Sequence, residues 1–520
     1  MKLSDKGLQK RKKWEAKRYV LPEYDRLAIR EKTKNEPTWL HFGAGNISRA
    51  YIAVLAQRLL DEGLIDKGLI MAEGYDYEII DDVYTPFDDL SIAVTLMPDG
   101  TKEKTVVGSV VESIKMDDDG EKRLCEIFSA NSLQMVSLTI TEKGYDVNIS
   151  DLTNGPNKSE AFLGKLAALC YHRYLNGAYP ISIVSMDNCS HNGNVLYNAI
   201  RRYVVKWIDR GFVDGNFLEY IDNPNLVYFP STMIDKITPY PDESVYNTLT
   251  DDGVKNMKGI VTEKNSFVAP YVNTESPEYL VVEDKFPNGR PPLEKVGVIF
   301  TDLETVDKVE KMKVCTCLNP LHTALAIFAC MLSYTRISDA MRDEDLLRLV
   351  KRVAEEGLPV VVDPGIISPS EFITTVIDVR FPNPFIPDTP QRIVTDTSKK
   401  LAVRFGETIK AYIAKDALDI TTLRAIPLVF AGWCRYLLGV DDNGEPYELE
   451  PDPMLYEIVP LLEDVKLGSS VDVSEILKPI LSNADIFGVD LYEVNLGNTV
   501  IEYFELLIKG TGAVRDTLRG

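Results

Sequence analysis

A glycine turn between a short apolar run and a helical pattern constrains the fold of this chain more than any other feature. Residues 38–42 are rich in β-forming side chains and end at Gly43-Ala-Gly45-Asn-Ile-Ser48. Apolar side chains then recur at helical spacing at Ile52, Leu55 and Leu59. A strand that turns through two closely spaced glycines into a helix is typical of a nucleotide-binding βαβ unit.

The pattern of apolar residues changes near residue 300. Before that point, helical patterns alternate with β-like runs at residues 68–72, 91–96, 105–111, 134–140 and 179–185. Beyond it, helical patterns occupy residues 321–334, 345–356, 399–414, 422–438 and 495–520. We therefore predict an α/β Rossmann-type, doubly wound N-terminal domain and a mainly α-helical C-terminal domain. The expected boundaries are an N-terminal extension over 1–35, a dinucleotide-binding domain with a β-containing insert over 36–300, and a helical substrate and catalytic domain over 301–520.

Charge and cysteine usage exclude several classes of partner. The 57 basic and 79 acidic side chains give a net charge of −22, which repels nucleic acid and anionic membranes. No long, purely apolar run predicts a membrane span, and the basic first 19 residues lack the apolar core of a secretory signal, so we expect a solvated helical extension there. Seven cysteines and four histidines show no metal-ligand spacing, which indicates reduced thiols, a cytoplasmic protein and no metal site.

The glycine turn has the features of a dinucleotide site, although Ser48 stands where a third glycine is usual. The first two glycines allow a tight turn and a close approach to a pyrophosphate, and the helix that follows presents its positive end. Glu73 ends the next apolar run, where a carboxylate accepts hydrogen bonds from ribose hydroxyls and repels a 2′-phosphate. This favours NAD over NADP. The alternatives are that Glu73 is an ordinary exposed loop residue, or that Asp76 takes its role.

A second motif carries groups suited to hydride transfer. Residues 311–322 read Lys-Met-Lys-Val-Cys-Thr-Cys-Leu-Asn-Pro-Leu-His, and we expect them at the entry to a helix. An amine can exchange a proton with an alcohol, and an amide can stabilise a developing alkoxide.

Further ordered segments extend the pattern over most of the chain. They are Leu138-Thr-Ile-Thr-Glu-Lys-Gly-Tyr145, Ser185-Met-Asp-Asn-Cys-Ser-His-Asn-Gly193, Phe229-Pro-Ser-Thr-Met-Ile-Asp-Lys-Ile-Thr-Pro239, Val282-Glu-Asp-Lys-Phe-Pro-Asn-Gly-Arg290 and Pro427-Leu-Val-Phe-Ala-Gly-Trp-Cys-Arg435. With the two motifs above, they resemble the polyol-specific long-chain dehydrogenase/reductase family, from about residue 38 to about residue 440. That family includes mannitol dehydrogenases and the fructuronate and tagaturonate reductases. The resemblance implies an NAD(P)-dependent, metal-independent enzyme with a lysine as general acid/base.

Lys313 is the match to the family's lysine. The usual pattern is K-x-x-x-x-N-x-x-H, and Asn319 and His322 keep their mutual spacing. Lys313 lies one residue too far from Asn319, and a one-residue bulge at residues 315–317 explains the shift. Lys311 remains the alternative. A lysine buried beside other cations has a lowered pKa, which suits proton transfer near neutral pH.

The resemblance also assigns residues around the substrate. Asn188 and Asn319 match paired amides that bind the substrate oxygen, while the alternative for Asn188 is an Asx-turn. His322 orients the lysine or binds a hydroxyl, or else is an ordinary helix histidine. Asp235 accepts bonds from the polyol chain or the lysine, or else is a structural cap. His191 and Asn192 are interpreted as loop scaffolding.

A later segment matches the family residues that contact the distal end of the substrate. Arg392 and Lys400 fall on its basic positions, Arg380 precedes them, and an arginine binds a carboxylate at two points. A surface position is the alternative for Arg392 and Lys400. The residues expected to contact the cofactor are Gly43, Ala44, Gly45, Asn46, Ile47, Glu73, Thr141 and Glu142.

These residues predict an NAD-dependent oxidoreductase of a small sugar acid or polyol. D-Fructuronate and D-mannonate are the preferred pair. Mannitol 2-dehydrogenase activity on mannitol and fructose, or tagaturonate reduction, is the alternative. A more remote alternative is a nucleotide-binding sensor without catalysis, of which the shifted lysine would be the sign. The expected protein is a monomer or small homo-oligomer.

Overall fold

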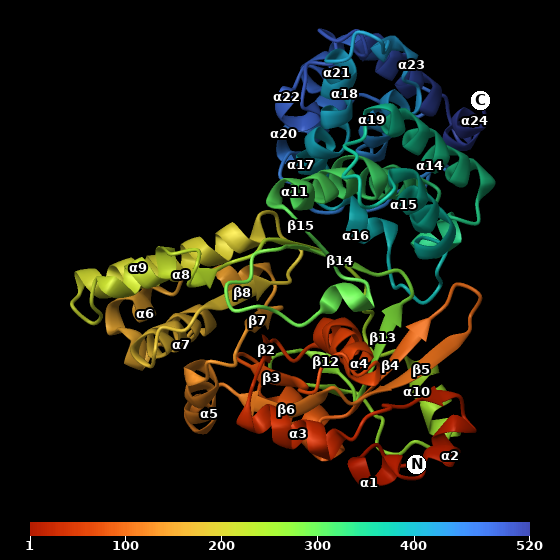
Figure 1. Ribbon diagram of the computed structural model, residues 1–520. Helices are drawn as coiled ribbons and strands as arrows, with labels where there is room; N and C mark the ends of the chain where they lie inside the picture. Colours follow the sequence, from red (N-terminus) through yellow and green to blue (C-terminus); the bar gives the residue numbers. More distant parts are fainter. The chain divides into compact units, whose positions relative to one another are not determined.

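The computed structural model describes all residues, 1–520, and divides the chain into two compact units. The first unit comprises Met1–Asp307 and the second Lys308–Gly520. Figure 1 shows strands throughout the first unit and only helices in the labelled elements of the second.

A parallel sheet forms the centre of the first unit. Its six strands follow the order β6-β3-β2-β7-β8-β9, and every neighbouring pair is parallel. Strands β6, β3, β2, β7 and β8 are labelled in Figure 1. The strands are β2 (Trp39–Phe42), β3 (Leu69–Glu73), β6 (Val110–Lys115), β7 (Met135–Leu138), β8 (Ile181–Ser185) and β9 (Val227–Tyr228). The chain order reverses between β2 and β7, so the carboxyl end of β2 lies at the switch point where α/β sheets bind ligands.

Both faces of this sheet are buried, which explains its continuous apolar runs. Alternate residues of one strand point to opposite faces. Leu40 and Phe42 pack with α5, α7, α8 and α9, whereas Trp39 packs with α4 and with strands outside the sheet. The helices are α4 (Ala53–Asp61), α5 (Asp118–Ser129), α7 (Phe162–Leu175), α8 (Asn192–Asp209) and α9 (Asn216–Asp222). The predicted doubly wound α/β domain is confirmed.

Three small sheets accompany the parallel one. The strands of the first, in the order β1-β5-β4-β13, are β1 (Tyr19–Val20), β5 (Lys102–Val107), β4 (Ser91–Leu96) and β13 (Tyr271–Glu275). The strands of the second are β10 (Thr232–Asp235), β14 (Tyr279–Glu283) and β15 (Ile299–Thr301). The third small sheet has two antiparallel strands, β11 (Ile260–Val261) and β12 (Phe267–Val268). The β-like run at 91–96 therefore belongs to a separate sheet. The run at 105–111 divides at Gly108 and Ser109 between β5 and β6, because the two sheets take different parts of it.

The N-terminal segment is part of the first unit. It is helical and has many exposed residues, as predicted, but it also makes buried contacts that a solvated extension would lack. Trp14 is fully buried, and β1 pairs in parallel with β5. Arg26 is buried and donates to the carbonyls of Gly108 and Val110. The basic composition concealed these contacts, because long cationic side chains bury their stems while they reach distant carbonyls. The other helices of this unit are α1 (Asp5–Leu8), α2 (Arg11–Glu15), α3 (Arg26–Asn35), α6 (Ile149–Asn154) and α10 (Glu243–Asp251).

The second unit is built around two helices that are apolar on all sides. These are α12 (Asn319–Met331) and α19 (Ala425–Tyr436). Every residue of α19 is buried. They approach closely at Gly432, where a Cβ atom would lie 2.5 Å from the ring of Phe328. The predicted helical C-terminal domain is confirmed.

The remaining helices of the second unit surround this core. They are α13 (Ile337–Ala340), α14 (Glu344–Gly357), α15 (Pro369–Thr375), α16 (Pro390–Val394), α17 (Thr397–Leu401), α18 (Glu407–Ile413), α20 (Leu455–Ile458), α21 (Val473–Leu481), α22 (Ala484–Phe487), α23 (Gly497–Leu507) and α24 (Ala513–Arg519).

One long helix spans Leu303–Met331 and comprises α11 (Leu303–Met312), the π-helical turn η7 (Lys313–Cys317) and α12. By length and composition alone it could cross a membrane. Its most apolar window is 78% buried inside the structure, which is the property of a core helix.

Candidate active site

The glycine turn after β2 forms an open cradle at the switch point of the sheet. Gly43 has a φ of +102°, and a Cβ atom there would lie 2.1 Å from the carbonyl oxygen of Thr139, so the fold itself requires this glycine. Gly45 differs, since a Cβ atom there would meet no protein atom within 4 Å. The space beside Gly45 therefore suits a ligand that approaches the backbone, as a pyrophosphate does.

Side chains hold this cradle from beneath. Ser48 is buried and donates from Oγ to the carbonyl of Gly45 at 2.9 Å, which is the role that a hydroxyl can take where a third glycine is missing. Arg49 is also buried and donates to the carbonyl of Ala269 at 2.5 Å and to Oδ1 of Asn46 at 2.9 Å. The first turn of the helix keeps its N–H groups free for an anion.

Glu73 is tied to the cradle rather than exposed in a loop. Its side chain is only 6% exposed, and Oε2 accepts the N–H of Ala44 at 2.7 Å. Its Oε1 accepts the N–H groups of Tyr75 at 2.8 Å and Asp76 at 3.2 Å. Asp76 is 2% exposed and accepts the hydroxyl of Thr262, while its Oδ1 is buried without a partner. Both carboxylates lie at the carboxyl end of β3, where the sequence predicts contact with the ribose.

The loops after β7 and β8 are fastened together by Asp187. This buried carboxylate accepts the N–H groups of Ile140 and Thr141, each at 2.9 Å, and the hydroxyl of Tyr145 at 2.7 Å. Burial raises the pKa of Asp187, while these bonds oppose the rise. Thr141 has a φ of +63°, an uncommon conformation for a β-branched residue, which the bond to Asp187 helps to hold.

Asn188 follows Asp187 and is exposed, and its side-chain amide makes no hydrogen bond, so it is not engaged in an Asx-turn. Asn192 is fully buried and exchanges bonds with Thr232 while donating to the carbonyl of Asp187, which confirms it as scaffolding. The Nδ1 atom of His191 lies 3.3 Å from Oδ1 of Asp307. Asp235 ends strand β10 and is 6% exposed, so it is not a helix cap.

In the second unit, the predicted lysine lies in a widened helical turn. The N–H of Leu318 donates to the carbonyl of Lys313 at 3.1 Å, which is the bond pattern of a π turn. A π turn accommodates one extra residue, so the separation between Lys313 and Asn319 corresponds to the shorter α-helical separation of the family pattern. The predicted bulge is confirmed. Lys313 is 5% exposed, whereas Lys311 is exposed.

His322 lies next to Asp388, which in turn pairs with Arg392. Its Nε2 lies 3.0 Å from Oδ2 of Asp388, without the direction of a good hydrogen bond, and its ring is tilted over Phe381. The other oxygen of Asp388 accepts Nε and Nη2 of Arg392, at 3.1 Å and 2.5 Å. Burial lowers the pKa of His322, although Asp388 opposes this. Burial alone would raise the pKa of Asp388, yet His322 and Arg392 hold it below its ordinary value.

Lys400 and Arg404 complete a basic cluster with Arg392. Lys400 donates to the carbonyls of Ile393, at 3.1 Å, and Thr395. Burial and the neighbouring Arg404 lower the pKa of Lys400. Arg404 lies in the π-helical turn η10 (Ala402–Gly406) and donates to the hydroxyl of Thr323 on α12. Arg380 is 5% exposed and ends the π-helical turn η9 (Val376–Arg380).

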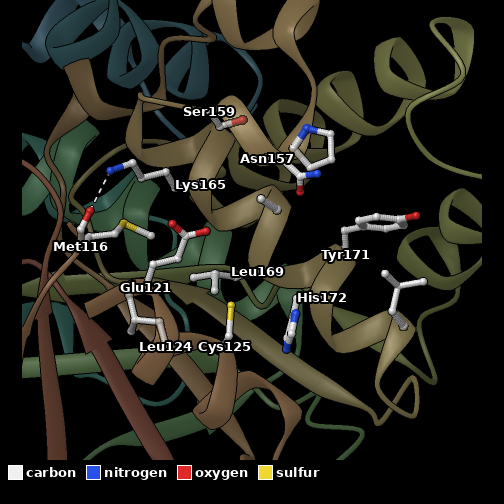
Figure 2. A pocket seen from close by; sticks show the side chains of 13 residues that line it. Met116, Glu121, Leu124, Cys125, Asn157, Ser159, Lys165, Leu169, Tyr171 and His172 are labelled. Atoms are coloured by element: carbon white, nitrogen blue, oxygen red, sulfur yellow. Dashed lines mark hydrogen bonds between the residues drawn. The ribbon is translucent and has the colours of Figure 1, made fainter. Parts of the chain in front are cut away.

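A separate cavity in the first unit is not this site. It lies between α5 and α7, and its labelled side chains include Glu121, Cys125 and His172 (Figure 2). Figure 2 shows Lys165 directed at the carbonyl of Met116, to which it donates at 2.7 Å. None of the residues predicted to bind cofactor or substrate lines it.

Two family models account for most of the chain. The model of the mannitol dehydrogenase Rossmann domain matches residues 37–295, and that of the mannitol dehydrogenase C-terminal domain matches residues 305–506. The chain belongs to the mannitol dehydrogenase family. It is therefore an oxidoreductase of the dehydrogenase type, and the resemblance inferred from the motifs is confirmed.

Relatives and solved structures extend over nearly the whole chain. The D-mannonate oxidoreductase of Thermotoga maritima is 48% identical over 100% of this chain and 98% of its own. The Pseudomonas fluorescens mannitol 2-dehydrogenase, solved as a ternary complex with NAD and D-mannitol, is 25% identical and covers 100% of this chain and 99% of its own, with a TM-score of 0.69. A substrate-free D-sorbitol dehydrogenase has a TM-score of 0.78 at 24% identity, with 96% and 97% coverage.

Within this mannitol dehydrogenase family member, the structure groups the predicted residues by unit. The glycine turn, Glu73 and the loops after β7 and β8 lie at the carboxyl ends of neighbouring strands of the first unit. Lys313, Asn319 and His322 share one helix of the second unit, beside the basic cluster.

Three residues of these groups were not predicted from the sequence. Asp187 is adjacent to Asn188 in a quoted motif, and Asp388 lies four residues before Arg392. Arg404 lies one turn after Lys400, so the spacing of these two cations on a helical face was the available signal.

Proposed function

We propose that this enzyme interconverts D-fructuronate and D-mannonate with NAD as cofactor. The proposal rests on the 48% sequence identity, over the full length of this chain, to a protein named D-mannonate oxidoreductase. A cluster of cations in the second unit supports it, since a sugar acid brings a carboxylate that a neutral polyol lacks. In a chain of net charge −22, a local basic cluster is needed to attract an anion.

The cofactor is NAD, held by the first unit. Gly45 leaves room for the pyrophosphate, and the first turn of the helix after it supplies N–H donors. The buried carboxylate of Glu73 lies where the ribose hydroxyls are bound in this fold and disfavours a 2′-phosphate. Thr141 and Glu142 contribute from the loop after β7. The bound cofactor supplies the hydride that the carbonyl carbon accepts.

The general acid/base is Lys313. During reduction, its ammonium donates a proton to the oxygen of the carbonyl group, and in the reverse direction its amine removes the proton of the alcohol. No metal ion is required, because the ammonium polarises the oxygen. The burial of Lys313, in contrast to the exposure of Lys311, supports this choice.

Neutral donors stabilise the oxygen as charge develops on it. The side-chain amides of Asn188 and Asn319 make no hydrogen bonds in the structure, so their N–H groups are available to an alkoxide. His322 is held by Asp388 and binds a substrate hydroxyl in its neutral form, which burial favours. Asp235, Arg380, Arg392 and Lys400 bind the rest of the sugar chain.

A substrate panel tests the proposal. The purified enzyme is given fructuronate, tagaturonate or fructose with NADH or NADPH, and loss of the reduced cofactor is followed by absorbance. We expect the highest kcat/KM with fructuronate and NADH. A preference for fructose would favour the mannitol dehydrogenase of the structural comparison, and one for tagaturonate the third alternative. NADH binding without turnover of any substrate would contradict catalysis and favour a sensor.

A further inference from the structure

Most arginines buried in this protein have their donors occupied. Arg173 donates to backbone carbonyls at Phe128, Ala130, Leu133, Tyr179 and Pro180, and Arg435 to those at Val440, Asp441 and Leu507. Such groups act as structural clamps, since every buried polar atom needs a partner. Arg404 is different. Its one hydrogen bond reaches the hydroxyl of Thr323, and it has no carboxylate partner.

Arg404 itself carries a positive charge that no adjacent carboxylate balances. Desolvation lowers its pKa to about 10, so the guanidinium remains charged at neutral pH without compensation. It is close enough to His322 and Lys400 to lower the pKa of each, after their burial. An uncompensated, partly buried charge is costly, and proteins usually retain one only where a ligand supplies the opposite charge.

The other cations of the cluster are already engaged. Arg392 uses Nε and Nη2 on Asp388, and its side chain is 68% exposed. Lys400 is held by two backbone carbonyls. Arg404 alone keeps most of its planar set of N–H donors unused, and such a set fits the two oxygens of a carboxylate.

The position of Arg404 in the fold suits a substrate group distant from the reacting carbon. The turn that carries it, η10, packs against η7, which carries Lys313. Thr408, just beyond η10, donates to the carbonyl of Cys315 in η7 at 3.5 Å. Both turns belong to the second unit. In fructuronate, the keto group and the carboxylate lie near opposite ends of the sugar chain, and they need separate binding groups on neighbouring elements.

We propose that Arg404 binds the carboxylate of the sugar acid at two points and thereby selects sugar acids over neutral polyols. Thr323, fully buried on α12, orients the guanidinium through its hydroxyl. This inference rests on the proposed function, because it names the group that recognises the acid end of the proposed substrate. Arg392 and Lys400 then contact the hydroxyls.

The test uses two substrates that differ only at one end. Fructuronate and fructose share their carbonyl carbon and stereochemistry, and a carboxylate replaces a hydroxymethyl group in the former. In Arg404→Met, we expect kcat/KM for fructuronate with NADH to fall on the order of 10²- to 10³-fold, because a charged hydrogen-bonded pair is lost. The kcat/KM for fructose should change by less than about threefold. Arg404→Lys should recover part of the loss, because it keeps the charge without the planar donors.

Two controls separate substrate binding from folding. Lys399→Met removes an exposed cation next to Lys400, and it should leave kcat/KM unchanged for both fructuronate and fructose. The unfolding temperature of Arg404→Met should not fall, since the substitution removes an uncompensated charge and retains the apolar stem. Calorimetric titration of mannonate into the enzyme with NADH should show the same loss of affinity in Arg404→Met, and it requires no turnover.

The outcomes distinguish this inference from the proposed function. If Arg404→Met lowers kcat/KM for both substrates equally, or binds mannonate as the wild type does, Arg404 does not recognise the carboxylate. If instead the wild type itself prefers fructose and binds mannonate no better than mannitol, the proposed substrate is wrong and the inference falls with it.

Discussion

The cofactor cradle of the first unit and the basic cluster of the second are built on opposite principles. In the cradle, Glu73 accepts three backbone N–H groups, and Arg49 and Ser48 use their donors on nearby acceptors. In the second unit, Arg404 of the basic cluster keeps most of its donors unused, and the side-chain amide of Asn319 on the long helix makes no hydrogen bond. Saturated groups hold a fixed shape around the space for the cofactor. Unsaturated groups leave selectivity to the charge of the substrate.

This difference predicts that substitutions in the two regions affect different properties of the enzyme. Changes in the cradle should alter cofactor affinity or stability and leave the choice of substrate unchanged. Changes along the long helix and in the basic cluster should alter turnover or substrate choice and leave cofactor affinity unchanged.

The largest effect is expected from the lysine of the long helix. Lys313→Ala should lower kcat on the order of 10²- to 10⁴-fold, because the proposed general acid/base is removed, with the affinity for NADH nearly unchanged. Lys311→Ala is the matched control, since this neighbouring lysine is exposed, and it should retain activity. Steady-state kinetics and NADH fluorescence titration measure the two quantities. The opposite result for the pair would transfer the role to Lys311.

The two glycines of the cradle should respond in different ways. Gly45→Val should leave stability nearly unchanged but weaken NADH binding by at least about tenfold, or about 1.4 kcal/mol, because the new side chain fills ligand space. Gly43→Ala should instead lower the free energy of unfolding by about 1–3 kcal/mol, through its positive φ and its contact with Thr139. Thermal unfolding and NADH titration distinguish them. A stable Gly43→Ala that binds NADH would contradict this interpretation of the turn.

The carboxylates beside the cradle should determine the choice between NAD and NADP. Glu73→Gln should raise the ratio of NADPH to NADH affinity by about tenfold, because the charge that repels a 2′-phosphate is removed. It should also cost about 1–2 kcal/mol of stability, since one backbone N–H loses its acceptor. Asp76→Asn is the comparison. A change in cofactor preference with Asp76→Asn alone would assign the role to Asp76.

The smallest effect concerns His322 and its partner. Asp388 stabilises the imidazolium form, so Asp388→Asn should lower the pKa of His322 further than burial already does. NMR titration can follow it, since the chain has only four histidines. Neutral His322 should then persist to lower pH, with kcat unchanged and KM raised a few-fold, because Arg392 loses its negatively charged partner. A higher pKa in the variant would contradict the arrangement.

The sequence predicted the parts of the fold that follow from local patterns. The glycine turn, the alternation of strands and helices, and the helical second half all follow from periodicity and glycine placement. The division of residues 105–111 between two sheets did not follow, because sheet membership depends on partners distant in sequence. The burial of Trp14 was missed for the same reason.

The candidate site shows a similar limit. Motif spacing predicted roles for Lys313, Asn319 and His322, which remain predictions, and the shifted lysine pointed correctly to a bulge in the helix. Arg404 was missed because its distinguishing property is the absence of a carboxylate partner. Such a property depends on what the folded chain places nearby, and no residue pattern encodes it.

The widened turn at Lys313 has a consequence for how such enzymes are recognised. An inserted residue in an α-helix would rotate everything before it by about 100°, from 3.6 residues per turn. Here a single π-helical turn accommodates the extra residue, so the side chains before and after it keep their positions around the helix axis. A search that demands fixed letter spacing would discard this protein as inactive, whereas a comparison of angular positions around the helix axis would retain it.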